Sequence, residues 1–263
     1  MEIIENLSTF TKRFAAWRGD ERLLGYPFVE NSRAPFTPLR RALPMLNLGL
    51  ISTAGGYIDG TEAFDIDSRD GESGFHEIPI EVEAADLKFA AKGYDARAVL
   101  EDRNAQVPID RLVEYEANAV IGRLNEVWWS TSCYIPNAQV VAEELAPKLS
   151  ERLARYSVTA ALIIPASRLC HQTAGIIARR LEADGIPSVM ISVDKPASER
   201  IRAPRTTYYK GELGSVVGPA GWPEFQRRVL DETLRNMETF DQPGLRRLAV
   251  ELESKVEAAR GER

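Results

Sequence analysis

The sequence has few of the residues that carry covalent or metal chemistry. Its 263 residues include two cysteines, Cys133 and Cys170, and two histidines, His76 and His171. Two cysteines cannot build a framework of several disulfides, so we expect a protein of the reducing cytoplasm. A zinc site would have to combine these four side chains or add carboxylates, and no ligand spacing supports one. We therefore predict no metal and no bound cofactor.

The sequence also lacks an excess of positive charge and any long apolar run. The net charge is -6 and the basic pairs are scattered, which argues against a nucleic-acid partner. No segment approaches the roughly 18–20 apolar residues of a membrane span. The opening "MEIIENLSTFTKRF" lacks the basic start and apolar run of a signal peptide. We expect a small-molecule substrate and no membrane.

Apolar runs alternate with amphipathic segments along most of the chain, which is 44% hydrophobic. The pattern predicts strands at 46–52, 126–131, 157–164 and 186–193. It predicts helices at 7–17, 108–124, 138–156, 171–184, 223–240 and 244–259, with a kink or restart at Pro147. Strands alternating with helices indicate an α/β fold with a parallel sheet of Rossmann- or flavodoxin-like architecture and C-terminal helices.

The distribution of these segments suggests two α/β lobes. Residues 1–40 read as an N-terminal arm, 41–135 as a first lobe and 136–263 as a second lobe with C-terminal helices. The first lobe contains a long irregular insertion at 57–107, in which 76–82 resembles an inserted strand. Long irregular segments within compact domains are usually functional or act as lids.

The two cysteines fall where a parallel sheet keeps its chemistry, outside the carboxyl ends of the strands. Cys133 follows the strand at 126–131, and Cys170 follows the strand at 157–164. Cys170 is predicted at or just before a helix N-terminus, where unpaired N–H groups and the helix dipole favour a thiolate. The alternative is a buried cysteine that acts as a small apolar residue. The flanking aromatic residues favour that alternative for Cys133.

Other candidates surround the cysteines, and each has a structural alternative. His171 is a candidate proton partner for Cys170, or a helix residue bonded to the backbone. The glycine-rich loop with Thr53, Gly55 and Gly56 could hold an anion on its N–H groups, or form only a tight turn. His76 could reach the site from a lid, or lie in an exposed loop.

Several segments resemble a known family. They include "LGLISTAGG", "YDARAVLEDRNAQVPIDRLVEYEANAVIGRL", "YIPN", "CHQTAGIIARRLEADGIPSVMIS", "RAPRTTYY" and "ELGSVVG". In this order they resemble the selenoprotein B subunits of glycine, sarcosine and betaine reductases and the related D-proline reductase subunits, over about residues 30–235. The resemblance implies an α/β fold with a redox motif at a strand–helix junction. It also implies reductive cleavage of an amine by a selenocysteine or cysteine, with partner subunits and a thiol reductant.

The chain departs from this family at positions that carry its chemistry. Ser167 stands where relatives have selenocysteine or cysteine, so Ser167 and Cys170 cannot close a selenide–sulfide or disulfide bond. The family's His-Tyr-Asp motif appears as Gly93 followed by Tyr94 and Asp95, which the resemblance places at the substrate. Cys133 could supply the missing thiol if its Cα atom lies within about 7 Å of that of Cys170.

Our first hypothesis is therefore a thiol-dependent enzyme that cleaves a small amino acid or amine-like substrate reductively. Cys170 would be the nucleophile, His171 would transfer protons, Cys133 would resolve the intermediate and Ser167 would donate a hydrogen bond. An external thiol reductant and a partner subunit or a second copy of the chain would complete the system. The alternatives are a cofactor-free racemase or isomerase with two thiols, and a homologue that binds a ligand or partner without turnover.

Overall fold

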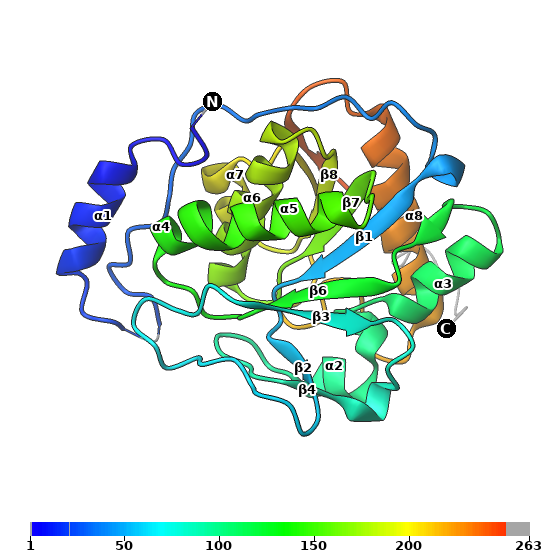
Figure 1. Ribbon diagram of the computed structural model, residues 1–263, viewed down its shortest axis with the longest axis horizontal. Helices are drawn as coiled ribbons and strands as arrows, with labels where there is room; N and C mark the ends of the chain where they lie inside the picture. Colours follow the sequence, from blue (N-terminus) through cyan, green and yellow to red (C-terminus); the bar gives the residue numbers. More distant parts are fainter. Residues whose placement is uncertain (1, 21, 251–263) are drawn as a thin grey trace.

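The computed structural model describes residues 2–20 and 22–250, and its centre is one sheet of eight strands with helices on both faces (Figure 1). The strand order is β10-β9-β8-β7-β1-β6-β3, with β5 paired to β1. The bounds of these strands are β1 Asn47–Ser52, β3 Phe75–Pro79, β5 Arg123–Leu124, β6 Val127–Thr131, β7 Ala160–Ile164, β8 Ser188–Ser192, β9 Arg205–Tyr208 and β10 Gly244–Arg247.

The sheet is parallel except for β3, which pairs antiparallel with β6. The run β6-β1-β7-β8-β9 has the order 2-1-3-4-5 of flavodoxin-like folds, so the predicted α/β architecture is confirmed. Strand β1 from the predicted lobe 41–135 lies between β6 and β7, and β7 comes from the predicted lobe 136–263. Both lobes therefore contribute strands to one sheet.

Helices cover the two faces unequally. Their bounds are α1 Leu7–Ala16, α2 Arg97–Glu101, α3 Ile109–Ala117, α4 Ala138–Val140, α5 Ala146–Arg155, α6 Arg168–Ala183, α7 Lys195–Ile201 and α8 Pro223–Thr239. Helices α1 and α4 to α7 pack against one face, and α3 and α8 against the other. Successive strand residues alternate between these two layers, so Ile51 and Ile163 belong to the first core and Leu50 and Leu162 to the second.

The helical segment before β7 changes type where the sequence predicts a restart. A π-helical turn, Val141–Leu145, separates α4 from α5, and Pro147 lies in the first turn of α5. Proline has no N–H group, so the carbonyl of Glu143 cannot receive the usual helical hydrogen bond from residue 147. A π turn at this point accommodates the missing bond.

The C-terminal prediction is partly wrong. Residues 244–247 form β10 and not the start of a helix over 244–259. They pair with β9 through backbone hydrogen bonds, with Gly244 opposite Arg205, and this pairing overrides the amphipathic pattern. The remainder of the predicted helix, from residue 251, lies outside the described residues. Helix α7 and strand β9 were not predicted.

Two helix boundaries also differ from the prediction. Helix α6 begins at Arg168, three residues before the predicted start, because Ser167 caps it. Helix α3 ends at Ala117, well before residue 124, and Ala119 has a positive φ of 54° that breaks the helix.

The predicted insertion at 57–107 contains a small sheet as well as the confirmed strand β3. Strands β2, Gly56–Ile58, and β4, Leu87–Phe89, pair antiparallel. Within the described residues, no helix is long and apolar enough to cross a bilayer.

Candidate functional site

The loops that follow three neighbouring strands converge on the thiol of Cys170. Its Sγ lies 3.0 Å from the carbonyl oxygen of Thr53, after β1, and 3.2 Å from that of Cys133, after β6. Cys170 itself follows β7. The chain runs from β1 to β6 on one side and returns to β7 on the other, so this is the point where the strand order reverses. Ligands of doubly wound sheets bind at such points.

Ser167 is the N-cap of helix α6, which runs over 16 residues. Its backbone is extended, with φ -123° and ψ 175°, and its Oγ accepts a hydrogen bond from the N–H of Cys170 at 3.1 Å. Only 2% of Ser167 is exposed. The side chain of Ser167 therefore has a structural role in the first turn of the helix that carries Cys170.

Cys133 is a buried thiol bonded to the backbone. Its Sγ accepts from the N–H of Lys92 at 3.0 Å and donates to the carbonyl of Ala90 at 2.9 Å. Burial, and then the nearby Cys170 thiol, raise the pKa of Cys133 far above its ordinary value. The thiol is therefore protonated at neutral pH in this conformation, which matches its role as a donor to Ala90.

The segment 90–95 covers the two cysteines. Besides the bonds to Cys133, Ala90 donates its N–H to the carbonyl of Gly55 at 2.9 Å. The hydroxyl of Tyr94 donates to the carbonyl of Ala54 at 2.6 Å. Burial, and then the two cysteines, raise the pKa of Tyr94, so this hydroxyl stays a donor. These bonds hold the segment to the loops after β1 and β6.

Gly93 lies in this cover beside Ser167. Its φ of 81° belongs to the left-handed region that glycine adopts without strain. A Cβ atom on Gly93 would lie 3.4 Å from the Cβ of Ser167. The side chain of Tyr94, the next predicted substrate residue, points toward the loop after β1, where its hydroxyl meets Ala54. The carboxylate of Asp95 instead lies on the surface and accepts from Arg97 Nε at 2.7 Å.

His171 is fully buried and both of its ring nitrogens are used. Nδ1 lies 2.7 Å from the carbonyl of Ser167, and Nε2 accepts from the N–H of Val193 at 3.4 Å. A neutral ring with its proton on Nδ1 satisfies both contacts. Burial lowers the pKa of His171, which favours this neutral form.

The loop after β1 is tightly held by backbone groups. Thr53 donates its N–H to Ile164 at 3.2 Å, and Gly55 donates to Thr131 at 3.0 Å. Gly55 has a φ of 73°, and a Cβ there would lie 2.6 Å from the carbonyl oxygen of Ala90. Gly56 enters β2. In this conformation the N–H groups of Thr53 and Gly55 are occupied by main-chain acceptors.

Four buried hydroxyls lie at or just after the ends of β1 and β6, and of the residues that carry them only Thr53 was a predicted site residue. They belong to Ser52, Thr53, Ser130 and Thr131. All four residues are fully buried, and these hydroxyls make no hydrogen bond within the described part of the chain. Buried polar groups normally find a protein, water or ligand partner.

His76 lies on β3, away from the helix that carries Cys170. It is opposite Ser130 in the strand register, and its ring meets the edge of Phe64 at a centroid distance of 4.4 Å. Among residues 2–20 and 22–250, no group of three or more His, Cys, Asp or Glu side chains could hold a metal.

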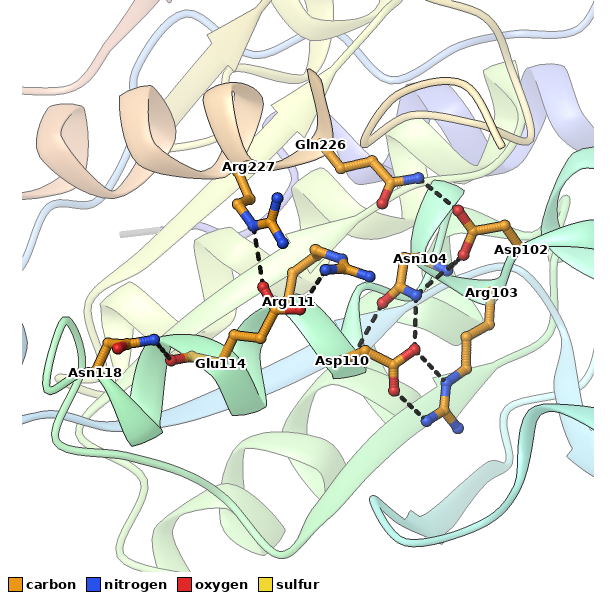
Figure 2. Close-up of polar contacts among 9 residues, drawn as sticks. All are labelled: Asp102, Arg103, Asn104, Asp110, Arg111, Glu114, Asn118, Gln226 and Arg227. Carbon is orange, nitrogen blue, oxygen red and sulfur yellow. Dashed lines mark hydrogen bonds and ion pairs between the residues drawn. The ribbon is translucent and has the colours of Figure 1, made fainter. Parts of the chain in front are cut away.

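A polar network joins residues 102–118 to helix α8 (Figure 2). The carboxylate of Asp110 accepts from Arg103 and from Asn104, and Asp102 accepts from Asn104 and Gln226. Burial alone would raise the pKa of Asp110, but the bonds from Arg103 and Asn104 lower it below its ordinary value. Apart from Gln226 on α8, these residues lie in or just before the segment "VPIDRL".

The side chain of Gln106 joins the end of β7 to the loop before α8. Gln106 Oε1 accepts from the N–H of Val216 at 3.2 Å, and Nε2 donates to the carbonyl of Ile164 at 3.5 Å. Gly214 also donates to Ala166 at 2.9 Å. The end of β7 is thereby tied to the loop between β9 and α8.

A small hollow opens beside the cover. It has a volume of about 200 Å³, and its lining includes Lys92, Gly93, Ser167, Arg168 and Leu213. It is the opening that lies next to the N-terminus of α6 and to segment 90–95. A ligand that approaches the cysteines from this side would meet Ser167 and Gly93 first.

Comparisons with known proteins support the resemblance drawn from the sequence. A model of the glycine/sarcosine/betaine reductase selenoprotein B family matches residues 73–166, from just before β3 to the loop after β7. The D-proline reductase subunit gamma of Acetoanaerobium sticklandii is 24% identical over 202 residues, which are 77% of this chain and 82% of the relative. No solved structure matches the chain significantly.

Two longer relatives are components of reductase complexes. The glycine reductase complex component B subunit gamma of Symbiobacterium thermophilum is 26% identical, over 72% of this chain and 44% of the relative. The sarcosine reductase complex component B subunit beta of Peptoclostridium acidaminophilum is 26% identical, over 81% of this chain and 50% of the relative. The chain thus spans about half the length of these two proteins.

Proposed function

Because the chain is related to the glycine/sarcosine/betaine reductase selenoprotein B family, we propose that it is a thiol-dependent component of an amino-acid reductase system. Its substrate would be a small amino acid or an amine-like compound. The observation that carries the proposal is the contact of Cys170 Sγ with the backbone of Cys133 at 3.2 Å, where the strand order reverses. Relatives that are named as reductase subunits support the reaction class.

The proposed reaction uses the two thiols as a pair. The sulfur of Cys170 attacks the substrate carbon, a C–S bond forms, and the amine leaves with the electrons of the C–N bond and takes up a proton. The sulfur of Cys133 then attacks Cys170, and the carbon leaves with the C–S electron pair and takes up a proton. The two thiols are oxidised to a disulfide while the substrate is reduced by two electrons. An external dithiol restores the thiols by exchange.

The cover must open for this reaction. Both cysteines are buried, and Cys133 is protonated and bonded to Ala90 and Lys92. Lifting segment 90–95 breaks these bonds together with the bond from Tyr94 to Ala54. The same movement admits water, which lowers the cost of forming a thiolate. Lids that open and close around a site in this way are common in enzymes.

A second function is favoured by the role of Ser167. Its hydroxyl is committed to the N-terminus of α6, and the relatives' redox group is absent from that position. A homologue that binds a ligand or a partner subunit without turnover would keep the crevice and need no nucleophile. If the protein only binds a ligand, its ligand affinity should survive replacement of Cys170. If it is a reductase, the same replacement should abolish the reaction and leave the fold intact.

A single-turnover experiment separates these functions. The fully reduced protein is incubated without reductant with glycine, sarcosine or D-proline, and its intact mass is recorded. Reductive cleavage gives a free amine or ring-opened product and one disulfide, which lowers the mass by about 2 Da. The Cys133→Ser variant should retain the substrate carbon on Cys170, and Cys170→Ser should react with none of the three compounds.

Each other outcome has a distinct meaning. Inversion of D-proline without disulfide formation would support the two-thiol racemase. Binding without any reaction, retained in Cys170→Ser, would support the binding homologue and contradict the reductase.

A further inference from the structure

A second and larger hollow lies along the same edge of the sheet. Its volume is about 450 Å³, which is within the range of small-molecule sites. Val193 follows β8, Tyr208 ends β9 and Arg247 ends β10, and all three line the hollow. The hollow is therefore bounded by the carboxyl ends of three neighbouring parallel strands, the side on which doubly wound sheets bind ligands.

The lining of this hollow is strongly cationic. Arg168, Lys195, Lys210 and Arg247 contribute four positive side chains, and Asp194 is the one carboxylate among the lining residues. The chain as a whole has a net charge of -6, so this concentration of positive charge runs against the average of the protein. Clustered charge of one sign in a concave site attracts ligands of the opposite sign.

The carboxylate of Asp194 is already committed. Its Oδ1 accepts from the N–H of Ala197 at 3.0 Å, and its Oδ2 accepts from Arg168 Nε at 3.0 Å. Asp194 thereby fixes the side chain of Arg168 at the hollow while 60% of that side chain stays exposed. A fixed and exposed guanidinium is suited to bind a carboxylate or phosphate through two hydrogen bonds.

From the position, size and charge of this hollow we infer that it binds the anionic group, a carboxylate or a phosphate, of a small-molecule ligand. Arg168, Lys210 and Arg247 are the residues that meet the anion. Lys195 adds a further charge from the start of α7, although it also faces Glu199 at 3.5 Å.

The hollow between β8 and β10 shares two lining residues with the smaller hollow beside the cysteines. Arg168 and Leu213 line both. Arg168 is the first residue of α6, and Cys170 is two residues further along the same helix. A ligand whose anionic end sits between β8 and β10 would extend its other end past Arg168 toward Ser167 and Gly93. This connection to the thiols rests on the proposed function, whereas anion binding itself does not.

The test is calorimetric titration of the full chain at low ionic strength, where charge interactions are least screened. Acetate and inorganic phosphate serve as probes of the two anion sources, and acetamide serves as the uncharged control. We expect at least one anion to bind and acetamide not to bind. Arg247→Gln and Lys210→Gln should each weaken the binding by about tenfold, because a charge-assisted hydrogen bond contributes about 1.5 kcal/mol or more.

Arg41 offers a matched control at the opposite edge of the sheet. It lines a hollow of about 560 Å³ with Val158 and Pro187, which precede β7 and β8. Arg41→Gln makes the same change in net charge as Arg247→Gln but should leave the affinity for the anion unchanged. Since all three cations are exposed, these changes should not disturb folding.

Three results would overturn the inference. They are failure of both anions to bind, equal weakening by Arg41→Gln and Arg247→Gln, and binding that neither hollow variant changes. A failure of the anion site can be distinguished from a failure of the proposed reaction, because Cys170→Ser should bind the anion like the unmodified chain. Anion binding with no single-turnover reaction would retain the site and reject only the reaction.

Discussion

Replacement of Ser167 tests the role of this serine as the N-cap of α6, at a position where the resemblance implies a redox residue. In Ser167→Ala the N–H of Cys170 loses its acceptor, and this N–H lies at a helix start that is buried. Loss of a serine N-cap costs about 0.5–2 kcal/mol, and an unsatisfied buried donor costs about 1–3 kcal/mol. Since Ser167 is 2% exposed, we expect a loss within these two ranges, about 2 kcal/mol in the free energy of unfolding.

Ser167→Cys separates the cap from the chemistry. Sulfur is a weak hydrogen-bond acceptor, so the reduced variant should lose about 1–2 kcal/mol, close to the alanine variant. It also places a second thiol three residues before Cys170, across the first turn of α6. This is the Cys-x-x-Cys arrangement, whose thiols form a disulfide and have lowered pKa values at a helix start. The oxidised variant should therefore be about 2 Da lighter than its reduced form.

Urea unfolding followed by tryptophan fluorescence measures both variants. For a chain of this size, about 2 kcal/mol corresponds to a fall of roughly 4–8 °C in Tm. Ser73→Ala is the matched control, because Ser73 donates to Glu144 at 2.9 Å on the surface and should change stability by less than about 0.5 kcal/mol. If Ser167→Ala is no more destabilising than Ser73→Ala, the cap has no energetic role and the argument from Ser167 is wrong.

Two further predictions concern buried ionisable groups. Burial lowers the pKa of His171, so the unfolded state binds the proton more tightly, and the free energy of unfolding should fall as the pH drops below about 6.5. In urea unfolding, His171→Gln should weaken this dependence of the free energy of unfolding on pH. An unchanged pH dependence in the variant would refute the prediction. Glu182 and Arg205 form a fully buried ion pair, and Glu182 also accepts from the N–H of Ser188 at 2.8 Å. Glu182→Ala should lower the free energy of unfolding by about 3–5 kcal/mol. Glu151→Ala, which breaks an exposed pair with Arg155, should lower it by less than about 1 kcal/mol. Equal losses for the two variants in urea unfolding would contradict the value for Glu182→Ala.

Much of the sheet could be predicted from apolar runs. The strands that became β1, β6, β7 and β8 are buried along most of their length, and such runs bounded by loops are recognisable without a structure. The position of both cysteines after such strands was therefore visible. The rule that parallel strands align their carboxyl ends was sufficient to expect Cys133 and Cys170 at one edge.

The edge of the sheet could not be predicted in the same way. The residues of β10 have helical periodicity, but β9 offers an unpaired row of backbone groups, and pairing satisfies them. Helix α7 is short and begins with Lys195 and Pro196, so its pattern is too brief to be distinctive. Segment 90–95 has no periodicity, and its place over the cysteines depends on contacts with residues about 40 positions away.

Two of the departures from the pattern that the resemblance implies lie next to each other in the structure. Ser167 and Gly93 are far apart in the sequence, yet a Cβ on Gly93 would touch the Cβ of Ser167. The resemblance assigns a histidine to position 93 and a selenocysteine or cysteine to position 167, so both losses fall on one contact. A histidine at 93 would be strained by the φ of 81°, which indicates that the backbone of the cover is adapted to glycine.

The two departures, Gly93 and Ser167, therefore lie on one side of the first turn of α6. The sulfur of Cys170 instead contacts the loops after β1 and β6, at the carbonyls of Thr53 and Cys133. Reductive chemistry in this chain would have to pass through Cys133, because Ser167 cannot be oxidised and Gly93 has no side chain to move a proton. This makes Cys133 the residue whose replacement distinguishes a rerouted reductase from a homologue that only binds. A reductase whose turnover survives Cys133→Ser would contradict this route.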